Sequence, residues 1–230
     1  MKTKLLLLSF VLLSSIGRSQ NSSEEIGRDS VGAILTDLKK FIPEYLQIQN
    51  IPGVSIALVN DNNIVWADGF GFVNSITKKR VNTNTLFEVA SISKVVTAYI
   101  ALRLVDEGKL SLDKPLLSYL SKEWMPYSVY QDSIKLKHAL SHSSGLRKTT
   151  REIMFKPGSA YYYSANGFNL VKDVMEEVTG EKLEELAQRL VFQPLGMKNS
   201  SFARNDKLVP FTANGHIHAT VPIVLFGILF

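Results

Sequence analysis

Cysteine is absent from the 230-residue chain, so a disulfide framework is excluded. The sequence also lacks internal repeats and low-complexity linkers. Its length and its 45% hydrophobic content suit one globular domain of ordinary size. Composition alone therefore indicates a single folded domain without covalent cross-links.

Long membrane-spanning runs are also lacking, because the two most apolar stretches are too short for a comfortable span. The first begins the chain as "MKTKLLLLSFVLLSSIGRSQ", with Lys2 and Lys4 before an apolar core from Leu5 to Leu13. We interpret residues 1–19 as a secretory signal peptide, and an uncleaved anchor is the alternative. The predicted location is secreted or periplasmic. The second stretch, "HATVPIVLFGILF" at 218–230, predicts a buried strand or else a foreign or frame-shifted end.

A strong excess of one charge is lacking once the signal is set aside. The full chain has a formal charge of +5, and Lys2, Lys4 and Arg18 all lie within the predicted signal. Without them the charge is about +2. Nucleic acid and the membrane surface are therefore not expected as partners.

Periodicity and turn residues predict a helix, then a hairpin, then a mostly helical block. Apolar residues recur at helical spacing from Val31 to Ile48, with an expected end near Pro43 or shortly beyond. "GVSIALVN" and "NIVWADGFGFV" flank the turn residues "NDNN", as in a β-hairpin. Three later helices are expected over 91–108, 167–180 and 181–194, the first of them buried on most faces.

The pattern Ser-x-x-Lys, which is the spacing of an acyl-transfer nucleophile and its base, occurs three times. It is found as "SITK" at 75–78, "SISK" at 91–94 and "SLDK" at 111–114. A serine needs a nearby base to take its proton, and residues three apart on a helix share one face. The pair therefore needs a helix that begins at the serine, where free N–H groups can also steady an oxyanion.

Only "SISK" meets this requirement. "SITK" lies in a polar run after a strand, and Pro115 disfavours helical geometry at Lys114 of "SLDK". Ser91 begins the most apolar helix, with Lys94 expected to be buried one turn in. Taken alone, the tetrapeptide also fits an ordinary serine N-cap followed by a lysine that reaches solvent.

Five ordered blocks surround this tetrapeptide. They are "IPGVSIALVNDNNIVWADGFGFVN", "TLFEVASISKVVTAYIALRLVDEGKLSLDKPLLSYL", "LKHALSHSSGL", "KPGSAYYYSANGFNLVKDVMEEVTG" and "VFQPLGMKNSSF". Together they closely resemble the serine β-lactamase and penicillin-binding-protein superfamily, in the branch of class C β-lactamases, D-Ala-D-Ala carboxypeptidases and esterases. The resemblance covers roughly residues 30–203. It implies an α+β fold in which an antiparallel sheet packs with helices beside an all-helical lobe. It also implies Ser91 as the acylated nucleophile and Lys94 as its proton partner.

The second motif of this branch, Tyr-x-Asn, is altered. An ungapped match puts Tyr163 at the proton-relaying tyrosine and Ala165 where an amide-binding asparagine is usual, while Asn166 should point elsewhere. In a second register, "SAN" would make Ser164 the relay instead. We favour Tyr163, because the flanking "PG" and "GF" fix the match. Tyr161 or Tyr162 is expected to be a core aromatic.

The third motif, a Lys- or His-x-Gly triplet on a later strand, does not occur after Tyr163. We therefore interpret residues 20–230 as an incomplete domain in which the sheet is represented by the early hairpin only. A carboxy-terminal truncation is the favoured explanation, and a short pseudoenzyme that binds without turnover is the alternative. Either way we expect little or no hydrolysis by this chain, because losing one oxyanion donor already costs about 10²–10³ in rate.

The four histidines occur in two pairs, "HALSH" at 138–142 and "HIH" at 216–218. The first pair has a metal-ligand spacing but lacks the glutamate of a metalloprotease, and the second lacks a nearby aspartate. No metal and no cofactor are expected, and the family resemblance implies that "SHSSGL" is a structural turn of the helical lobe. The sequence thus predicts an exported serine hydrolase with catalytic residues Ser91, Lys94 and Tyr163. Its expected substrate is a small molecule or a peptidoglycan peptide. The alternative is a non-catalytic binder of cell-wall peptides or β-lactams.

Overall fold

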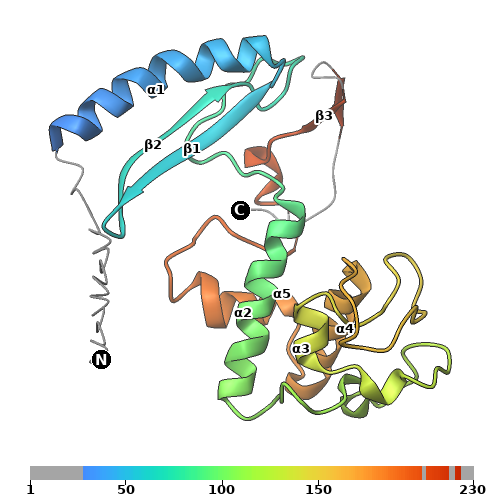
Figure 1. Cartoon of the computed structure of the whole chain (residues 1–230). Coiled ribbons are helices and arrows are strands. Elements are labelled where there is room, and N and C mark those ends of the chain that lie inside the picture. Colours follow the sequence, from blue (N-terminus) through green and yellow to red (C-terminus); the bar gives the residue numbers. More distant parts are fainter. Residues whose placement is uncertain (1–27, 204–205, 218–220, 224–230) are drawn as a thin grey trace, which may run out of the picture. The chain divides into compact units, whose positions relative to one another are not determined.

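The computed structural model describes residues 28–203, 206–217 and 221–223 (Figure 1). The chain divides into two compact units, Met1–Phe41 and Ile42–Phe230, and each is considered by itself. The predicted signal at 1–19 and most of the predicted carboxy-terminal strand lie outside the described residues. Within the described part of the chain, no helix is both long and apolar enough to cross a membrane.

The predicted first helix is confirmed as α1 (Arg28–Ile48). It continues through Pro43 for more than a turn, which agrees with an end beyond the proline. Its last turns belong to the second unit, where Ile42 and Leu46 are buried. Asn50, at a left-handed φ of 54°, ends the helical segment before the first strand.

The predicted hairpin is also confirmed, as β1 (Gly53–Asn60) paired antiparallel with β2 (Asn63–Gly71). Asp61 and Asn62 form its two-residue turn with φ values of 46° and 59°, a conformation that Asn and Asp tolerate well. Only glycine fits at position 71, where φ is 75°, because the Cβ of any other residue would lie 2.2 Å from the Pro52 carbonyl oxygen.

A second small sheet corrects the expectation that the hairpin is the whole of the sheet. β3 (Gly215–Ile217) pairs antiparallel with β4 (Val221–Ile223), so part of the apolar tail is extended chain. The segment before β3 returns to the loop that follows the hairpin. The Leu86 amide donates to the Phe211 carbonyl and the Ala213 amide donates to the Leu86 carbonyl, each over 2.8 Å, and the Asn214 amide donates to the Val73 carbonyl over 2.9 Å.

The helical block contains α2 (Ser93–Asp106), α3 (Leu136–Leu140), α4 (Ala165–Thr179) and α5 (Leu183–Ala187), and α5 continues as the π-helical turn η4 (Gln188–Phe192). Short 3₁₀ turns are η1 (Ala90–Ile92), η2 (Leu116–Tyr119), η3 (Gln131–Ser133) and η5 (Val209–Phe211). α2 packs against α4 and α5 (Figure 1). Their shared core holds fully buried side chains such as Ile100, Leu104, Leu170, Val174 and Leu186.

The helix α2 departs from its prediction in two ways. It begins at Ser93 rather than Ser91, because the two preceding residues form the turn η1. It is also buried along one side only. On the other side the large apolar residues are exposed, namely Ile92, Val95, Tyr99 and Leu102. Apolar content predicted burial on most faces, but within the described residues no element covers that side.

Candidate active site

Ser91, Lys94 and Tyr163 meet at the amino-terminal end of α2. The Tyr163 hydroxyl donates a hydrogen bond to Ser91 Oγ over 2.7 Å, and Lys94 Nζ donates to the same oxygen over 3.1 Å. Ser91 and Tyr163 are separated by 72 positions in the chain. The fold therefore brings together the three residues singled out from the sequence.

Local geometry explains the pairing of Ser91 with Lys94 although Ser91 precedes the α-helix. Residues three apart nearly eclipse one another in a 3₁₀ turn, so the pair shares one face across the junction of η1 and α2. Ala90 begins the turn at a left-handed φ of 44°. The Ser93 hydroxyl donates to the Ala90 carbonyl and so secures the turn from inside.

Lys94 is half-buried, which corrects the expected full burial of its side chain. Its ammonium lies 5.4 Å from the ring centroid of Tyr163 and 5.8 Å from that of Phe168, within the range of cation–π attraction. Among the described residues no carboxylate forms an ion pair with it. Aromatic faces, not an acid, therefore hold this cation beside Ser91.

The pKa of Tyr163 is lowered, first by its hydrogen bond with Ser91 and then by its hydrogen bond with Lys94. Both neighbours stabilise the phenolate relative to the phenol, since each can donate to the charged oxygen. Tyr163 stays open to solvent, with 37% of the residue's surface exposed. This tyrosine is thus an accessible group that releases its proton more readily than a free tyrosine.

Sequence reasoning missed His142, which was assigned to a structural turn. Its ring centroid lies 4.4 Å from that of Tyr163, and its backbone and Nδ1 contact the residues on either side of that tyrosine. Spacing gives no signal for this, because the turn after α3 and the segment before α4 meet only in the fold. Tyr161 and Tyr162 also differ from expectation: both are solvent-exposed and neither is a core aromatic.

A groove of about 440 Å³ adjoins Lys94. Its walls come from the first turns of α2, from the face of α4 that carries Ala165 and Asn169, and from the segment around Leu183. Lys172 and Glu176 lie further along the same wall. A substrate group that enters from the side of Lys94 would meet a small side chain at Ala165 and then mixed polar and charged ones.

A family model described as "Beta-lactamase" matches residues 38–223. This chain belongs to the beta-lactamase family. Protein flp of Staphylococcus aureus (strain N315) is 26% identical over 210 residues, which is 81% of this chain and 42% of that protein. D-aminopeptidase of Brucella anthropi is 28% identical over 208 residues, covering 78% and 37% of the two chains. The chain thus spans less than half the length of these curated relatives.

Several solved structures share the fold of this chain. A penicillin-binding protein homologue from Pyrococcus abyssi, described as octameric, superposes with a TM-score of 0.69 at 27% identity over 80% of this chain and 48% of its own. A class C beta-lactamase in complex with cefoxitin gives 0.73 at 24% identity over 86% and 62%. D-alanine carboxypeptidase AmpC from Burkholderia cenocepacia gives 0.74 at 20% over 85% and 58%. The expected β-lactamase-like α+β fold is confirmed.

In this beta-lactamase-family chain the residues of the altered second motif have distinct contacts. Ser164 is the N-cap of α4, where its hydroxyl accepts from the Gly167 amide and donates to the Arg147 carbonyl, so its side chain is engaged away from Ser91. Asn166 is buried and donates to the Arg147 and Thr150 carbonyls. Ala165 faces the groove. As expected for the first register, Tyr163 reaches Ser91 and Asn166 points elsewhere.

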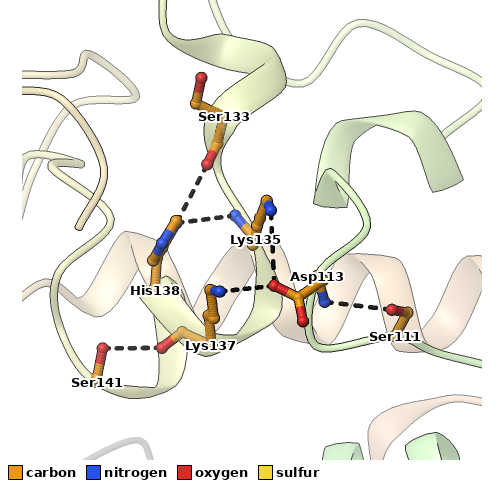
Figure 2. Close-up of polar contacts among 7 residues, drawn as sticks. All are labelled: Ser111, Asp113, Ser133, Lys135, Lys137, His138 and Ser141. Carbon is orange, nitrogen blue, oxygen red and sulfur yellow. Dashed lines mark hydrogen bonds and ion pairs between the residues drawn. The ribbon is translucent and has the colours of Figure 1, made fainter.

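The other two Ser-x-x-Lys stretches serve structure. In "SLDK" the Asp113 carboxylate pairs with Lys137 at 2.6 Å and Lys135 at 3.5 Å, and its amide donates to Ser111 (Figure 2). In "SITK" the Ser75 amide donates to Nε2 of His216 over 3.1 Å. Neither stretch is helical, in agreement with the sequence argument.

The two histidines of "HALSH" make different contacts. His138 caps α3, with Nδ1 3.1 Å from the Ser133 carbonyl and 3.3 Å from the Lys135 amide (Figure 2), whereas His142 reaches Tyr163. Over the described ranges, no three His, Cys, Asp or Glu side chains gather closely enough to hold a metal ion. Beyond Tyr163 the described strands are β3 and β4, and neither contains a Lys- or His-x-Gly triplet.

Proposed function

We propose that this chain is a serine hydrolase that cleaves amide or ester bonds through an acyl-enzyme. One observation carries the proposal, namely that Ser91 Oγ accepts hydrogen bonds from both Tyr163 and Lys94. A hydroxyl in contact with two groups that can exchange protons becomes an activated nucleophile when one of them has lost its own proton and takes that of the serine. Membership of the beta-lactamase family supports the same chemistry.

In the proposed reaction Ser91 Oγ bonds to the substrate carbonyl carbon while its proton passes to the Lys94–Tyr163 pair. The pair then protonates the departing amine or alkoxide, and water releases the acyl group by the reverse proton path. The lowered pKa of Tyr163 makes its proton-accepting form more accessible. The amino-terminal end of α2 beside Ser91 favours negative charge on the carbonyl oxygen.

The proposed substrates are β-lactams, peptides that end in D-amino acids, and simple esters. The names of the similar proteins support this range, since they include a D-aminopeptidase, a D-alanine carboxypeptidase and a β-lactamase complexed with cefoxitin. Ala165 in place of an amide side chain favours an esterase or peptidase of unusual specificity over an efficient β-lactamase. Turnover by the 230-residue chain is expected to be low, because the Lys- or His-x-Gly triplet is missing.

Covalent labelling tests the proposal directly. The purified chain is treated with a fluorophosphonate or a fluorescent penicillin, and the adduct is located by peptide mass spectrometry. Ser91→Ala should abolish the adduct. Ser75→Ala and Ser111→Ala are matched controls from the other two Ser-x-x-Lys stretches and should label as the wild type does. An adduct on any residue except Ser91 would refute the assignment.

A second function, binding without catalysis, is favoured by the missing triplet alone. Calorimetry with a β-lactam measures binding in either case, and denaturation of the complex distinguishes the two functions. A non-covalent binder would release the ligand unchanged on denaturation, and a serine hydrolase would retain a covalent acyl group on Ser91.

We also propose that the chain is exported, because residues 1–19 have the pattern of a secretory signal peptide. Expression of the full chain in a bacterium, followed by fractionation and amino-terminal sequencing, should yield a secreted or periplasmic form that begins close to Gln20. Retention of the whole product in the cytoplasm with Met1 intact would contradict the signal-peptide interpretation.

A further inference from the structure

We propose that His142 is a positioning residue that holds Tyr163 against Ser91 and that its neutral ring is the form that does so. The inference rests on the proposed function, because it assigns a support to one of the groups that would move the proton. It concerns a residue that touches neither Ser91 nor the proposed substrate.

Three separate contacts connect His142 with the three consecutive residues centred on Tyr163. The Tyr162 amide donates to the His142 carbonyl over 2.8 Å, and the Ser164 amide donates to His142 Nδ1 over 3.3 Å. Between these two hydrogen bonds, the imidazole lies against the Tyr163 ring, with 4.4 Å between centroids and a tilt of 36° between the planes. One residue therefore fixes both peptide neighbours and the ring of the tyrosine.

His142 is itself held firmly enough to serve as a support. It follows α3 at a left-handed φ of 56°, and its amide donates to the Ala139 carbonyl over 3.2 Å. The next residue, Ser143, donates to the His138 carbonyl and accepts from the Gly158 amide, each over 2.8 Å. A left-handed histidine persists only where its surroundings over-determine it, and such positions cluster at functional sites.

The imidazole also packs within an aromatic group that surrounds Lys94. Its centroid lies 5.2 Å from that of Phe168 and 6.0 Å from that of Tyr161, edge to face in the second case. The Lys94 ammonium lies over the rings of Tyr163 and Phe168. His142 and Phe168 thus limit where the Tyr163 ring can lie relative to Lys94.

The hydrogen bond from Ser164 assigns the tautomer, since Nδ1 accepts and the neutral ring must carry its proton on Nε2. Protonation at Nδ1 would remove that acceptor and place a second cation near Lys94. The charged and titratable groups that face the ring are Lys94 from α2 and Tyr161 and Tyr163 from the segment before α4, while α4 contributes the uncharged Phe168. Among the described residues no carboxylate offsets the charge.

Burial, followed by the charge of Lys94, lowers the pKa of His142. The ring is therefore neutral over a wider range of pH than a free histidine, and the support is lost only on acidification. Acylation of Ser91 should accordingly decline as the pH falls through the lowered pKa of His142.

His142→Asn is the informative variant, because asparagine tolerates the left-handed backbone and keeps an acceptor near Ser164 but has no stacking ring and no titration. The acylation rate of Ser91 by a fluorophosphonate should fall about 10- to 100-fold, the effect of a misplaced catalytic group. The acid decline assigned to His142 should vanish. His138→Asn is the matched control, because its pKa is also lowered by burial but its ring contacts the Ser133 carbonyl and the Lys135 amide and not Tyr163. It should label as the wild type does at every pH.

A second readout needs no activity. The ultraviolet titration of Tyr163, identified by difference from Tyr163→Phe, should move up toward the ordinary tyrosine range in His142→Asn and stay in place in His138→Asn. In the unmutated protein, the NMR signals of the Tyr163 ring should shift with the titration midpoint of His142 and not with that of His138.

The proposal would be overturned if His142→Asn had the labelling rate and the tyrosine titration of the wild type. It would also be overturned if the NMR signals of the Tyr163 ring did not change with the titration of His142. Absence of any Ser91 adduct in the wild-type chain would instead refute the proposed function. The two titrations would still decide the role of His142 in that case.

Discussion

Among single residues, Tyr163 differs from Tyr161 and Tyr162 although all three are adjacent tyrosines. Only its hydroxyl donates to Ser91, and among the three tyrosine rings only that of Tyr163 lies close to both the His142 imidazole and the Lys94 ammonium. The amide of Ser164, directly after it, is bound by His142, and the Ser164 side chain caps α4. The start of a helix therefore selects one tyrosine of three for the site.

Tyr163→Phe should lower the rate of Ser91 acylation by about 10²–10⁴-fold, the usual contribution of a group that transfers the proton. Thermal stability should change little, because the hydroxyl is at the surface and the ring is kept. Tyr161→Phe is the matched control, since that side chain is 71% exposed and only its ring contacts His142. Stopped-flow labelling measures both, and equal rates for the two variants would contradict a special role for Tyr163.

Ala165 lines the groove that adjoins Lys94. Ala165→Asn should supply an amide there and raise the ratio of amide to ester acylation by about 2- to 10-fold, the equivalent of one net hydrogen bond. Ala160→Asn makes the same change at an exposed residue outside the groove and should leave the ratio unaltered. Competition between an anilide and the matching phenyl ester measures the ratio. An unchanged ratio in Ala165→Asn would show that substrates do not enter past this residue.

Among elements, the helix termini follow local rules that the sequence displays. α4 ends at Gly180, which has the left-handed φ of 72° typical of a glycine C-cap, and its apolar face is buried as the periodicity predicts. The hairpin turn is equally local. These elements could be predicted because each depends on a few adjacent residues.

Gly180→Ala should lower the free energy of unfolding by about 1–2 kcal/mol, the cost of a left-handed L-residue. Crowding adds nothing, because no atom lies within 4 Å of a Cβ built there. Gly32→Ala is the opposite control, since this glycine lies inside α1 with open space around it, and should stabilise the helix by about 0.5–1 kcal/mol. Urea titration measures both, and a neutral Gly180→Ala would contradict the capping argument.

The features that sequence reasoning missed depend on distant contacts. Ser91 and Lys94 could be paired from their spacing, and Tyr163 was added through family resemblance. His142 could not be found in this way, because it contacts Tyr163, 21 positions later in the sequence, only through the left-handed turn that follows α3. The exposed side of α2 was also missed, since apolar content predicts burial whether or not a neighbouring element is there to cover it.

Across the whole molecule, stability is concentrated in the helical block. The main core cluster draws its fully buried side chains from residues 100–192, whereas neither strand of the hairpin contains a buried residue. A two-stranded hairpin is marginal by itself in water. Local opening should therefore be easier in the hairpin than in α2 and α4.

Hydrogen exchange followed by mass spectrometry should show this order. Amides of β1 and β2 should exchange at least 10-fold faster than those of α4 and of the second half of α2. Leu104→Ala, a core truncation expected to cost about 2–5 kcal/mol, should speed exchange in α4, while Val95→Ala on the exposed side of α2 should not. Equal protection in hairpin and helices would mean that the chain unfolds as one unit.

The contacts between the turn after α3 and the segment before α4 also set which changes in chain length the molecule can tolerate. Gly158 is hydrogen-bonded to Ser143, and Tyr162 and Ser164 are hydrogen-bonded to His142. These contacts therefore fix the number of residues that can lie between Gly158 and Ser164. One residue inserted after Gly158 would turn a different tyrosine toward Ser91, or none. By contrast, Lys148 and Thr149 are exposed and take part in none of these hydrogen bonds. Insertions and deletions that accumulate over evolution should therefore be found there and be rare between Gly158 and Tyr163.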